Sequence, residues 1–240
     1  MELTGRVALV TGGGTGLGAA VCRALADRGA LVAVNWLRSR EEAEVLAAAL
    51  PRAIAVQADV RDEAAIVAMV AEVERELGTT DLLVNNAGIT AYVPFEDLEA
   101  ITAANWEAIL GVNLVGAWSC TRAVVPGMRT RGAGAVVNVA SDSAFTMDGS
   151  SIPYVVSKAG LVTLTHALAR ALAPVVRVNA VAPGWMDTPW LDRFVPDDRR
   201  AALREGHEPT VPVADAAAAV VRLLADDAAT DQIIQLTPER

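Results

Sequence analysis

The stretch VALVTGGGTGLG at residues 7–18 decides the fold of this chain, because it joins an apolar run to a glycine-rich turn that opens an apolar helical pattern. Glycines adopt positive φ without strain and let an anion reach the backbone N–H groups at a helix N-terminus. The spacing GxxxGxG is wider than the common GxGxxG fingerprint. Glycine turns also occur without any ligand. The prediction of phosphate binding therefore rests on the position of this turn, directly between a strand and a helix. The candidate phosphate-binding residues are Gly12, Thr15, Gly16, Leu17 and Gly18.

The same alternation of a buried strand and an amphipathic helix continues along the chain. It predicts one doubly wound, Rossmann-like α/β domain over residues 1–240, with a parallel sheet of about seven strands and helices on both faces. Short apolar runs predict strands at 7–11, 31–35, 53–57, 82–86, 135–140, 175–181 and 232–236. Helical spacing of apolar residues predicts helices at 16–29, 40–50, 62–77, 103–130, 153–173 and 213–227.

Residues 186–212 do not fit this alternation. The segment contains Pro189, Pro196, Pro209 and Pro212, and a charge cluster DDRR at 197–200. A long excursion of this kind in a compact domain is typical of loops that carry function. Ligands of doubly wound sheets bind beyond the carboxyl ends of the strands. We therefore expect this segment to form a lid over a substrate site.

The composition excludes several classes of protein. Of 240 residues, 53% are hydrophobic and 20% are charged, which excludes a disordered or fibrous chain. The net charge of −9 has the wrong sign for a binder of nucleic acid or of an anionic membrane. The longest run without charge, residues 7–22, is shorter than the ~20 apolar residues of a membrane span. Cys22 and Cys120 lack a metal-ligand spacing, which predicts free thiols, no metal site and a cytoplasmic protein.

Tyr154 and Lys158 lie four residues apart in a predicted helix, so their side chains share one helix face. Lowering the pKa of a phenol by two to three units requires about 3–4 kcal/mol. One positive charge ~4 Å away supplies about 4 kcal/mol at an effective dielectric constant near 20. A chance YxxxK match is common, but Lys158 is the only lysine in the chain and Tyr154 one of only two tyrosines. The pair therefore predicts a tyrosine that exchanges protons near neutral pH.

A serine hydroxyl follows the fifth predicted strand, at the edge where a ligand should bind. Ser141 ends that strand, thirteen residues before Tyr154, and Ser143 lies two residues further on. Either hydroxyl could hydrogen-bond a carbonyl oxygen and stabilise developing negative charge. The two histidines, His166 and His207, follow no strand, so we expect no Ser–His–Asp site.

Several motifs occur in one order along the chain, and together they resemble the classical short-chain dehydrogenase/reductase family. They are TGGGTGLG at 11–18, Asp59, NNAG at 85–88, YVVSK at 154–158 and PG at 183–184. The resemblance covers roughly residues 3–236 and is nearest to the beta-ketoacyl-acyl-carrier-protein reductases. It implies an enzyme, an NAD(P)-dependent oxidoreductase acting on CH–OH and C=O groups. It also implies that Ser141 rather than Ser143 is the catalytic serine, and that the catalytic residues are Asn113, Ser141, Tyr154 and Lys158.

The resemblance also implies roles around a dinucleotide. Asn86 would brace neighbouring strands, Pro183 and Gly184 would flank the nicotinamide, and Thr188 would bond its carboxamide. Asp59 follows the third predicted strand and fits either an adenine amino group or the N-cap of the next helix. The expected cofactor-binding residues are Gly12, Thr15, Gly16, Leu17, Gly18, Asn35, Arg38, Ser39, Asp59, Val60, Asn86, Ala87, Gly88, Tyr154, Lys158, Pro183, Gly184 and Thr188.

The end of the second predicted strand favours NADP(H) over NAD(H). NAD-selective sheets usually carry an acidic residue there for the ribose hydroxyls, and the segment NWLRSR at 35–40 has none. Asn35, Arg38 and Ser39 could bind a 2′-phosphate instead. Thr15 does not fit this preference, because many NADP-dependent members of the family carry a basic residue at that position. Arg40 is expected to pair with Glu44 along its own helix.

The expected substrate pocket is apolar with a few hydroxyl groups. It suits a 3-oxoacyl chain or a small cyclic or aromatic ketone, free or bound to an acyl carrier protein. Arg129 and Arg131 are candidates for docking such an acidic carrier, although the net charge does not favour it. We expect a homo-oligomer, dimer or tetramer. The expected pocket residues are Tyr92, Val93, Phe145, Met147, Trp185 and Trp190.

Three functions remain open on the sequence. The first is an NADP(H)-dependent ketoreductase that transfers hydride between nicotinamide and a carbonyl or secondary alcohol. The second is an alcohol dehydrogenase of the same family that works oxidatively with NAD. The third is a regulator that senses the dinucleotide without turnover, which the presence of all four catalytic residues disfavours.

Overall fold

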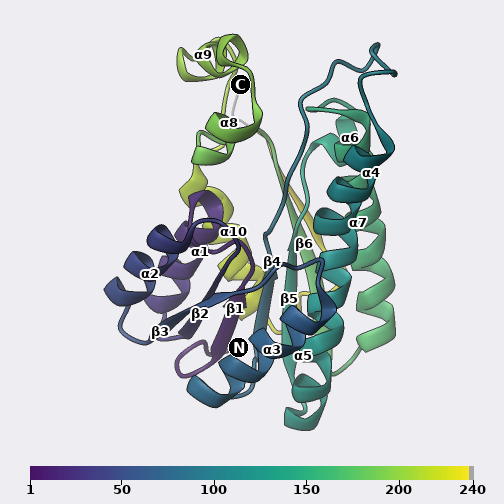
Figure 1. Ribbon diagram of the computed structural model, residues 1–240. Helices are drawn as coiled ribbons and strands as arrows, with labels where there is room; N and C mark the ends of the chain where they lie inside the picture. Colours follow the sequence, from purple (N-terminus) through teal and green to yellow (C-terminus); the bar gives the residue numbers. More distant parts are fainter. Residues whose placement is uncertain (238–240) are drawn as a thin grey trace.

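The computed structural model describes residues 1–237 and shows a seven-stranded sheet in which every neighbouring pair of strands is parallel (Figure 1). The strand order is β3-β2-β1-β4-β5-β6-β7, so the winding reverses between β1 and β4. This is the doubly wound, Rossmann-like sheet that the sequence predicts. Residues 238–240 of the expected domain lie outside the described residues. The strands are β1 (Val7–Val10), β2 (Leu31–Trp36), β3 (Ala53–Gln57), β4 (Leu82–Asn85), β5 (Gly134–Val139), β6 (Val176–Pro183) and β7 (Ile233–Leu236).

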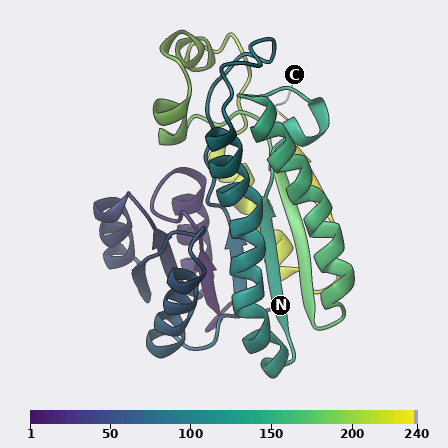
Figure 2. The same ribbon diagram turned by 45° about the vertical axis from the view of Figure 1, so that its right-hand side comes forward.

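Helices cover both faces of the sheet, as predicted (Figures 1 and 2). Two large apolar clusters lie between the helices and the sheet, one on each face. The strands β1, β2, β4, β5 and β6 are buried at every position because both of their faces are covered. One face carries α1 (Gly16–Ala26), α2 (Arg40–Ala49) and α10 (Val213–Ala225); the other carries α3 (Glu63–Glu76), α5 (Ala117–Arg131) and α7 (Ile152–Leu172).

The helix predicted at 103–130 is continuous, but its middle is wound differently. It consists of α4 (Ala103–Leu110), the π-helical segment η1 (Gly111–Gly116) and α5. A π-helical turn widens the helix locally and is frequent at functional sites. By length and composition alone, Ala103–Arg131 is apolar enough to cross a membrane. Its inner side chains, including Cys120 and Met128, are buried in the core beneath the sheet.

The segment 186–212 contains two short helices that the sequence does not predict, α8 (Pro189–Phe194) and α9 (Asp197–Arg204). They stand above the carboxyl ends of the strands, at the top of Figure 1. Leu191, Val195 and Leu203 form an apolar cluster of their own, apart from the two clusters under the sheet. The segment therefore packs as a small unit beside the edge where the ligand is expected.

The buried carboxylate of Asp81 holds the start of β4 to the start of β1. It accepts the backbone N–H of Val7 at 2.9 Å, and it pairs with Arg6 at 3.2 Å and with Arg131 at 3.1 Å. Its side chain is 2% exposed, whereas both arginines are partly open to solvent. Removing the carboxylate would leave a buried N–H group without its acceptor.

We expect the Asp81→Ala substitution to lower the free energy of unfolding by about 3 kcal/mol, because a buried charged hydrogen-bond acceptor with three partners is lost. Urea denaturation followed by circular dichroism measures this change. The control is Arg40→Ala, which removes the exposed pair with Glu44 at 2.8 Å and should change the stability by less than about 0.5 kcal/mol. Equal stability of the two variants would contradict this assignment.

Candidate active site

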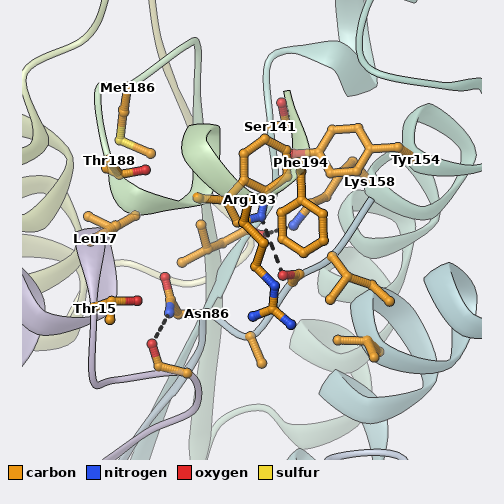
Figure 3. A pocket seen from close by; sticks show the side chains of 18 of the residues that line it. Thr15, Leu17, Asn86, Ser141, Tyr154, Lys158, Met186, Thr188, Arg193 and Phe194 are labelled. Carbon is orange, nitrogen blue, oxygen red and sulfur yellow. Dashed lines mark hydrogen bonds between the residues drawn. The ribbon is translucent and has the colours of Figure 1, made fainter. Parts of the chain in front are cut away.

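A cavity of about 620 Å³ lies at the carboxyl ends of the strands, between the glycine turn, α7 and the segment 186–212. Its volume is typical of small-molecule and cofactor sites. The winding of the sheet reverses directly below it, between β1 and β4. Figure 3 shows Thr15, Leu17 and Asn86 on one side of this cavity, and Ser141, Tyr154 and Lys158 on the other.

The glycine turn packs too closely to accept side chains. A Cβ on Gly18 would lie 2.3 Å from the carbonyl oxygen of Gly12 and 2.6 Å from Nδ2 of Asn86. Gly12 and Gly16 adopt positive φ values of 60° and 52°, which L-residues with side chains rarely adopt. Asn86 donates from Nδ2 to the carbonyl oxygens of Thr11 and Gly12 at 2.9 and 3.0 Å. The predicted bracing role of Asn86 thus has a direct structural basis.

The N-terminus of α1 opens toward this turn and fits the pyrophosphate of a dinucleotide. Thr15 is the N-cap residue, and its side chain accepts no hydrogen bond from the first turn of the helix. Backbone N–H groups at such a helix start attract anions. Thr188 closes the other side, since a Cβ on Gly16 would lie 3.2 Å from the Cβ of Thr188. Leu17, Ala87, Gly88, Pro183 and Gly184 line the same cavity.

Asn35 lines the cavity, but its side chain is bound within the protein and is not free to bind a phosphate as expected. Its side chain is 2% exposed. Nδ2 donates to the carbonyl oxygens of Ala58 and Val56 at 3.2 and 3.4 Å, and Oδ1 accepts the N–H of Gly12 at 3.2 Å. Both ends of the amide are therefore bound within the protein. The structure makes Asn35 a support of the glycine turn and leaves it no free donor for a phosphate.

Asp59 does not cap the helix that follows it, so the N-cap alternative was wrong. Asp62 caps α3 by accepting the N–H groups of Ala64 and Ala65 at 2.8 and 3.1 Å. Asp59 instead accepts from the guanidinium of Arg61 at 2.5 to 3.1 Å, and this contact lowers the pKa of Asp59. Together with Val60, both side chains line the adenine end of the expected dinucleotide path. Sequence reasoning missed Arg61.

Arg38 and Ser39 also line the cavity, at the exposed end of β2. Among the described residues 1–237, Arg38 forms no ion pair and the Ser39 hydroxyl makes no hydrogen bond that caps α2, whereas Arg40 pairs with Glu44 as expected. The positive charge of Arg38 contributes to the lowered pKa of Asp59. A cation and a hydroxyl are therefore free to contact an anion at this point.

Tyr154 and Lys158 face each other at the cavity, one turn apart in α7. Pro153 lies in the first turn of this helix, where its missing N–H costs nothing. Nζ of Lys158 lies 5.7 Å from the centre of the Tyr154 ring and donates to the carbonyl oxygen of Val139 at 2.8 Å. Burial of the ammonium lowers the pKa of Lys158 to about 8. The two side chains predicted from the YxxxK spacing thus lie together at the carboxyl end of β5.

Burial governs the phenol of Tyr154 in the protein alone. It raises the pKa of Tyr154 to about 12; the Ser141 hydroxyl offsets part of the rise and the negative charge of Asp142 adds to it. The sequence leads us to expect a pKa of Tyr154 that Lys158 and an oxidised nicotinamide lower together, whereas in the protein alone desolvation raises it. A phenol with a raised pKa remains protonated at neutral pH and can donate a proton.

Ser141 and Ser143 are in contact, which explains why the sequence leaves them hard to separate. Their hydroxyl oxygens lie 2.6 Å apart, and the Ser141 hydroxyl lies 3.1 Å from a carboxylate oxygen of Asp142. Both serines and Asp142 line the cavity. Ser141 is the one whose hydroxyl also influences Tyr154. Ser143 begins the short helix α6 (Ser143–Thr146).

Asn113 lies in η1, directly behind the cavity wall. Its Oδ1 accepts the N–H of Ile89 at 2.9 Å, and its Nδ2 donates to Ile89 O and to Ser157 Oγ, each at 3.0 Å. A Cβ on Gly88 would lie 3.7 Å from both Asn113 Oδ1 and Lys158 Nζ. Asn113 Oδ1 and Lys158 Nζ therefore both lie close to Gly88.

The structure divides the six expected substrate residues. Trp185 and Trp190 line the cavity, and the Trp190 ring lies 5.9 Å from the Tyr154 ring. Phe145 and Met147 are 40% and 58% exposed and do not line the cavity. Tyr92 packs against the apolar cluster of α8 and α9, and Val93 lines a separate, smaller recess. None of these four residues lines the cavity, so the expectation that they contact the substrate was wrong.

Other cavity residues escaped the sequence analysis. Arg193 and Phe194 of α8 reach into the cavity, and Figure 3 shows the Arg193 guanidinium on the side of Asn86, away from Ser141. The sequence feature that could have indicated them is an arginine next to a phenylalanine within the segment 186–212, which was expected to cover the substrate site. Within residues 1–237 no group of three or more His, Cys, Asp and Glu side chains is placed to hold a metal ion.

Comparisons with known proteins agree with this geometry. The short chain dehydrogenase family matches residues 6–199. A Streptomyces violaceoruber protein described as ketoacyl reductase 2 of the granaticin polyketide synthase is 43% identical over 95% of this chain and 93% of its own. The acetoacetyl-CoA reductase of Rhizobium meliloti is 38% identical over 93% and 92%. The crystal structure of 3-ketoacyl-(acyl-carrier-protein) reductase from Brucella melitensis complexed with NADH has a TM-score of 0.87, with 32% identity over 97% of both chains.

The fold and the site define a nicotinamide-dinucleotide-dependent oxidoreductase. The chain belongs to the short-chain dehydrogenase/reductase family. Within that family it is a ketoreductase and is most like the 3-oxoacyl-acyl-carrier-protein reductases.

The lowered pKa of Lys158 predicts a pH dependence of stability. Its folded value of about 8 lies below the ~10.4 of an unfolded lysine, so the unfolded state binds more protons between these values. The free energy of unfolding should therefore rise with pH, by about 2 kcal/mol between pH 8 and 10. Below pH 8 the cost of the buried charge is fully present. Lys158→Met should lack this rise.

Urea denaturation of both proteins at pH 7, 8, 9 and 10 measures the effect. The stability of the natural protein relative to Lys158→Met should increase across this range. Parallel curves for the two proteins would show that the ammonium is not desolvated.

Proposed function

We propose that the protein is an NADP(H)-dependent ketoreductase for 3-oxoacyl or small cyclic and aromatic ketones. The observation that carries the proposal is the convergence of Ser141, Tyr154 and Lys158 on one cavity that also contains the glycine turn. We infer a single catalytic domain over residues 1–240, with residues 186–212 as the lid over the substrate.

Each residue has a separate task in this reaction. The reduced nicotinamide supplies a hydride to the carbonyl carbon when it is bound. Ser141 donates a hydrogen bond to the substrate oxygen and fixes its position. Tyr154, kept protonated by burial, transfers its phenolic proton to that oxygen. Lys158 stabilises the resulting phenolate, and Asn113 positions the relay that returns a proton.

The preference for NADP(H) rests on the end of β2. Arg38 and Ser39 line the cavity there, and the segment 35–40 contains no carboxylate to repel a 2′-phosphate. Because the amide of Asn35 is already bound within the protein, Arg38 would provide most of this recognition.

The lid supports an apolar, ring-shaped substrate. The rings of Tyr154, Trp190 and Phe194 follow one another at 5.9 and 5.1 Å along the cavity. These rings are tilted by 49° and 52° to one another, and an aromatic lining of this kind favours flat apolar groups. A carrier-bound substrate is compatible with the open cavity, but Arg129 and Arg131 are poor docking candidates. They end α5 next to the start of β5, at the opposite edge of the sheet, and Arg131 pairs with Asp81.

A cytoplasmic homo-oligomer, a dimer or a tetramer, completes the proposal. Val115 and Trp118 near the start of α5 are 50% and 40% exposed, and Val156 on α7 is 44% exposed. Exposed apolar side chains on two adjacent long helices are suited to a subunit contact.

We expect Tyr154→Phe to lower the rate of NADPH oxidation with a ketone panel at least 100-fold, because the proton donor is lost. NADPH binding, measured by fluorescence titration, should remain within about threefold. The panel contains a 3-oxoacyl thioester, 2-tetralone and cyclohexanone. Faster oxidation of the matching alcohols with NAD would favour an alcohol dehydrogenase. Cofactor binding without turnover of any compound, unchanged in the variant, would favour a dinucleotide sensor.

We expect Arg38→Ala to raise the KM for NADPH about tenfold and to leave the KM for NADH nearly unchanged, because one charged hydrogen bond to a phosphate is lost. The control is Arg52→Ala, an exposed arginine just before β3, at the sheet edge opposite the cavity. An equal change for both cofactors would contradict recognition of the 2′-phosphate.

A further inference from the structure

A carboxylate lies directly beside the position of the reacting oxygen. An oxygen of Asp142 is 3.1 Å from Oγ of Ser141, and Asp142 lines the cavity. The Ser141 hydroxyl donates its single proton to Asp142 here, and when it turns to donate to a substrate carbonyl, that oxygen would lie about 2.8 Å from Oγ. The carboxylate and the reacting oxygen are therefore at most about 6 Å apart. The motif-based assignment of the catalytic residues gives Asp142 no role.

No cation neutralises this carboxylate within residues 1–237. Asp142 forms none of the ion pairs found there. Lys158 directs its Nζ to the carbonyl oxygen of Val139. The guanidinium of Arg193 lies across the cavity from Ser141 (Figure 3). Asp148, which also lines the cavity, is exposed and negative.

The carboxylate of Asp142 therefore adds an unpaired negative charge close to the reacting carbonyl, where Lys158 supplies a positive one. A second anion on the substrate, close to its carbonyl, would approach Asp142 closely. If the substrate's carboxylate lay as far from Asp142 as its carbonyl oxygen does, about 6 Å, the repulsion would weaken binding by a factor of about three in bulk water and about a hundred at an effective dielectric constant of 20. A neutral ester, thioester, amide or ketone experiences no such repulsion.

We propose that Asp142 is a specificity-determining residue that excludes free 3-oxo acids from the active site and restricts it to neutral 3-oxoacyl derivatives and ketones. The inference rests on the proposed ketoreductase function of the same site. It assigns the discrimination to one side chain, which contacts the serine that holds the substrate. The negative charge also favours the protonated form of Tyr154 over the phenolate.

The test compares two substrates of nearly the same shape, acetoacetate and acetoacetamide, with NADPH at pH 8. We expect the natural protein to have a kcat/KM at least about tenfold higher for the amide. Asp142→Asn has the same size and no charge, and we expect it to reduce this ratio to about threefold or less. The side chain of Asp142 makes no hydrogen bond that caps α6, so the helix does not depend on its charge.

The matched control is Asp148→Asn, which removes one negative charge from the exposed rim of the same cavity. It should change the ratio by less than about threefold, because water screens its charge. An equal effect of both variants would assign the discrimination to the overall charge and overturn the role of Asp142.

One further measurement needs no variant. Competitive inhibition of the natural protein by 3-hydroxybutyrate should be at least about tenfold weaker than by 3-hydroxybutyramide. A natural protein that reduces the amide and acetoacetate equally well would overturn the inference and leave the ketoreductase function intact. A protein that reduces neither these compounds nor any ketone of the panel would overturn the proposed function itself.

Discussion

The close approach of the glycine turn to the end of β4 is the constraint on which the site depends. Gly18 lies so near to Gly12 and Asn86 that no Cβ fits between them. This contact fixes the start of α1 above the point where the sheet reverses its winding. Because every strand is parallel, their carboxyl ends meet at that one edge. The serine after β5 and the tyrosine of α7 are thereby brought to the same cavity as the phosphate-binding turn.

Desolvation is the second feature that connects the structure to its chemistry. Lys158 is buried and Tyr154 is half-buried, and desolvation moves their pKa values in opposite directions, up for the phenol and down for the ammonium. Each group is therefore closer to its neutral form than it would be in water. A neutral phenol is the form that can donate a proton to a carbonyl oxygen. Asp142 adds a negative charge at the same place, which acts in the same direction on Tyr154.

The segment with α8 and α9 adds what the sheet lacks. The sheet edge offers small residues and hydroxyl groups, whereas the lid contributes Trp190, Phe194 and Arg193. Its apolar cluster is separate from the two clusters under the sheet, and Tyr92 and Tyr154 contact the segment from the dinucleotide fold. Differences in such a segment can change the substrate without disturbing the catalytic residues.

The sequence by itself determined the order of strands and helices, the glycine turn and the YxxxK pair. Each of these depends on local spacing: apolar periodicity, the conformational freedom of glycine, and the i, i+4 geometry of a helix. The tertiary structure decided the rest. It bound the amide of Asn35 inside the protein, turned Phe145 outward and placed Asp142 beside Ser141. These outcomes depend on which distant segments share one cavity and on how much water the packing removes, and local spacing carries no information about either.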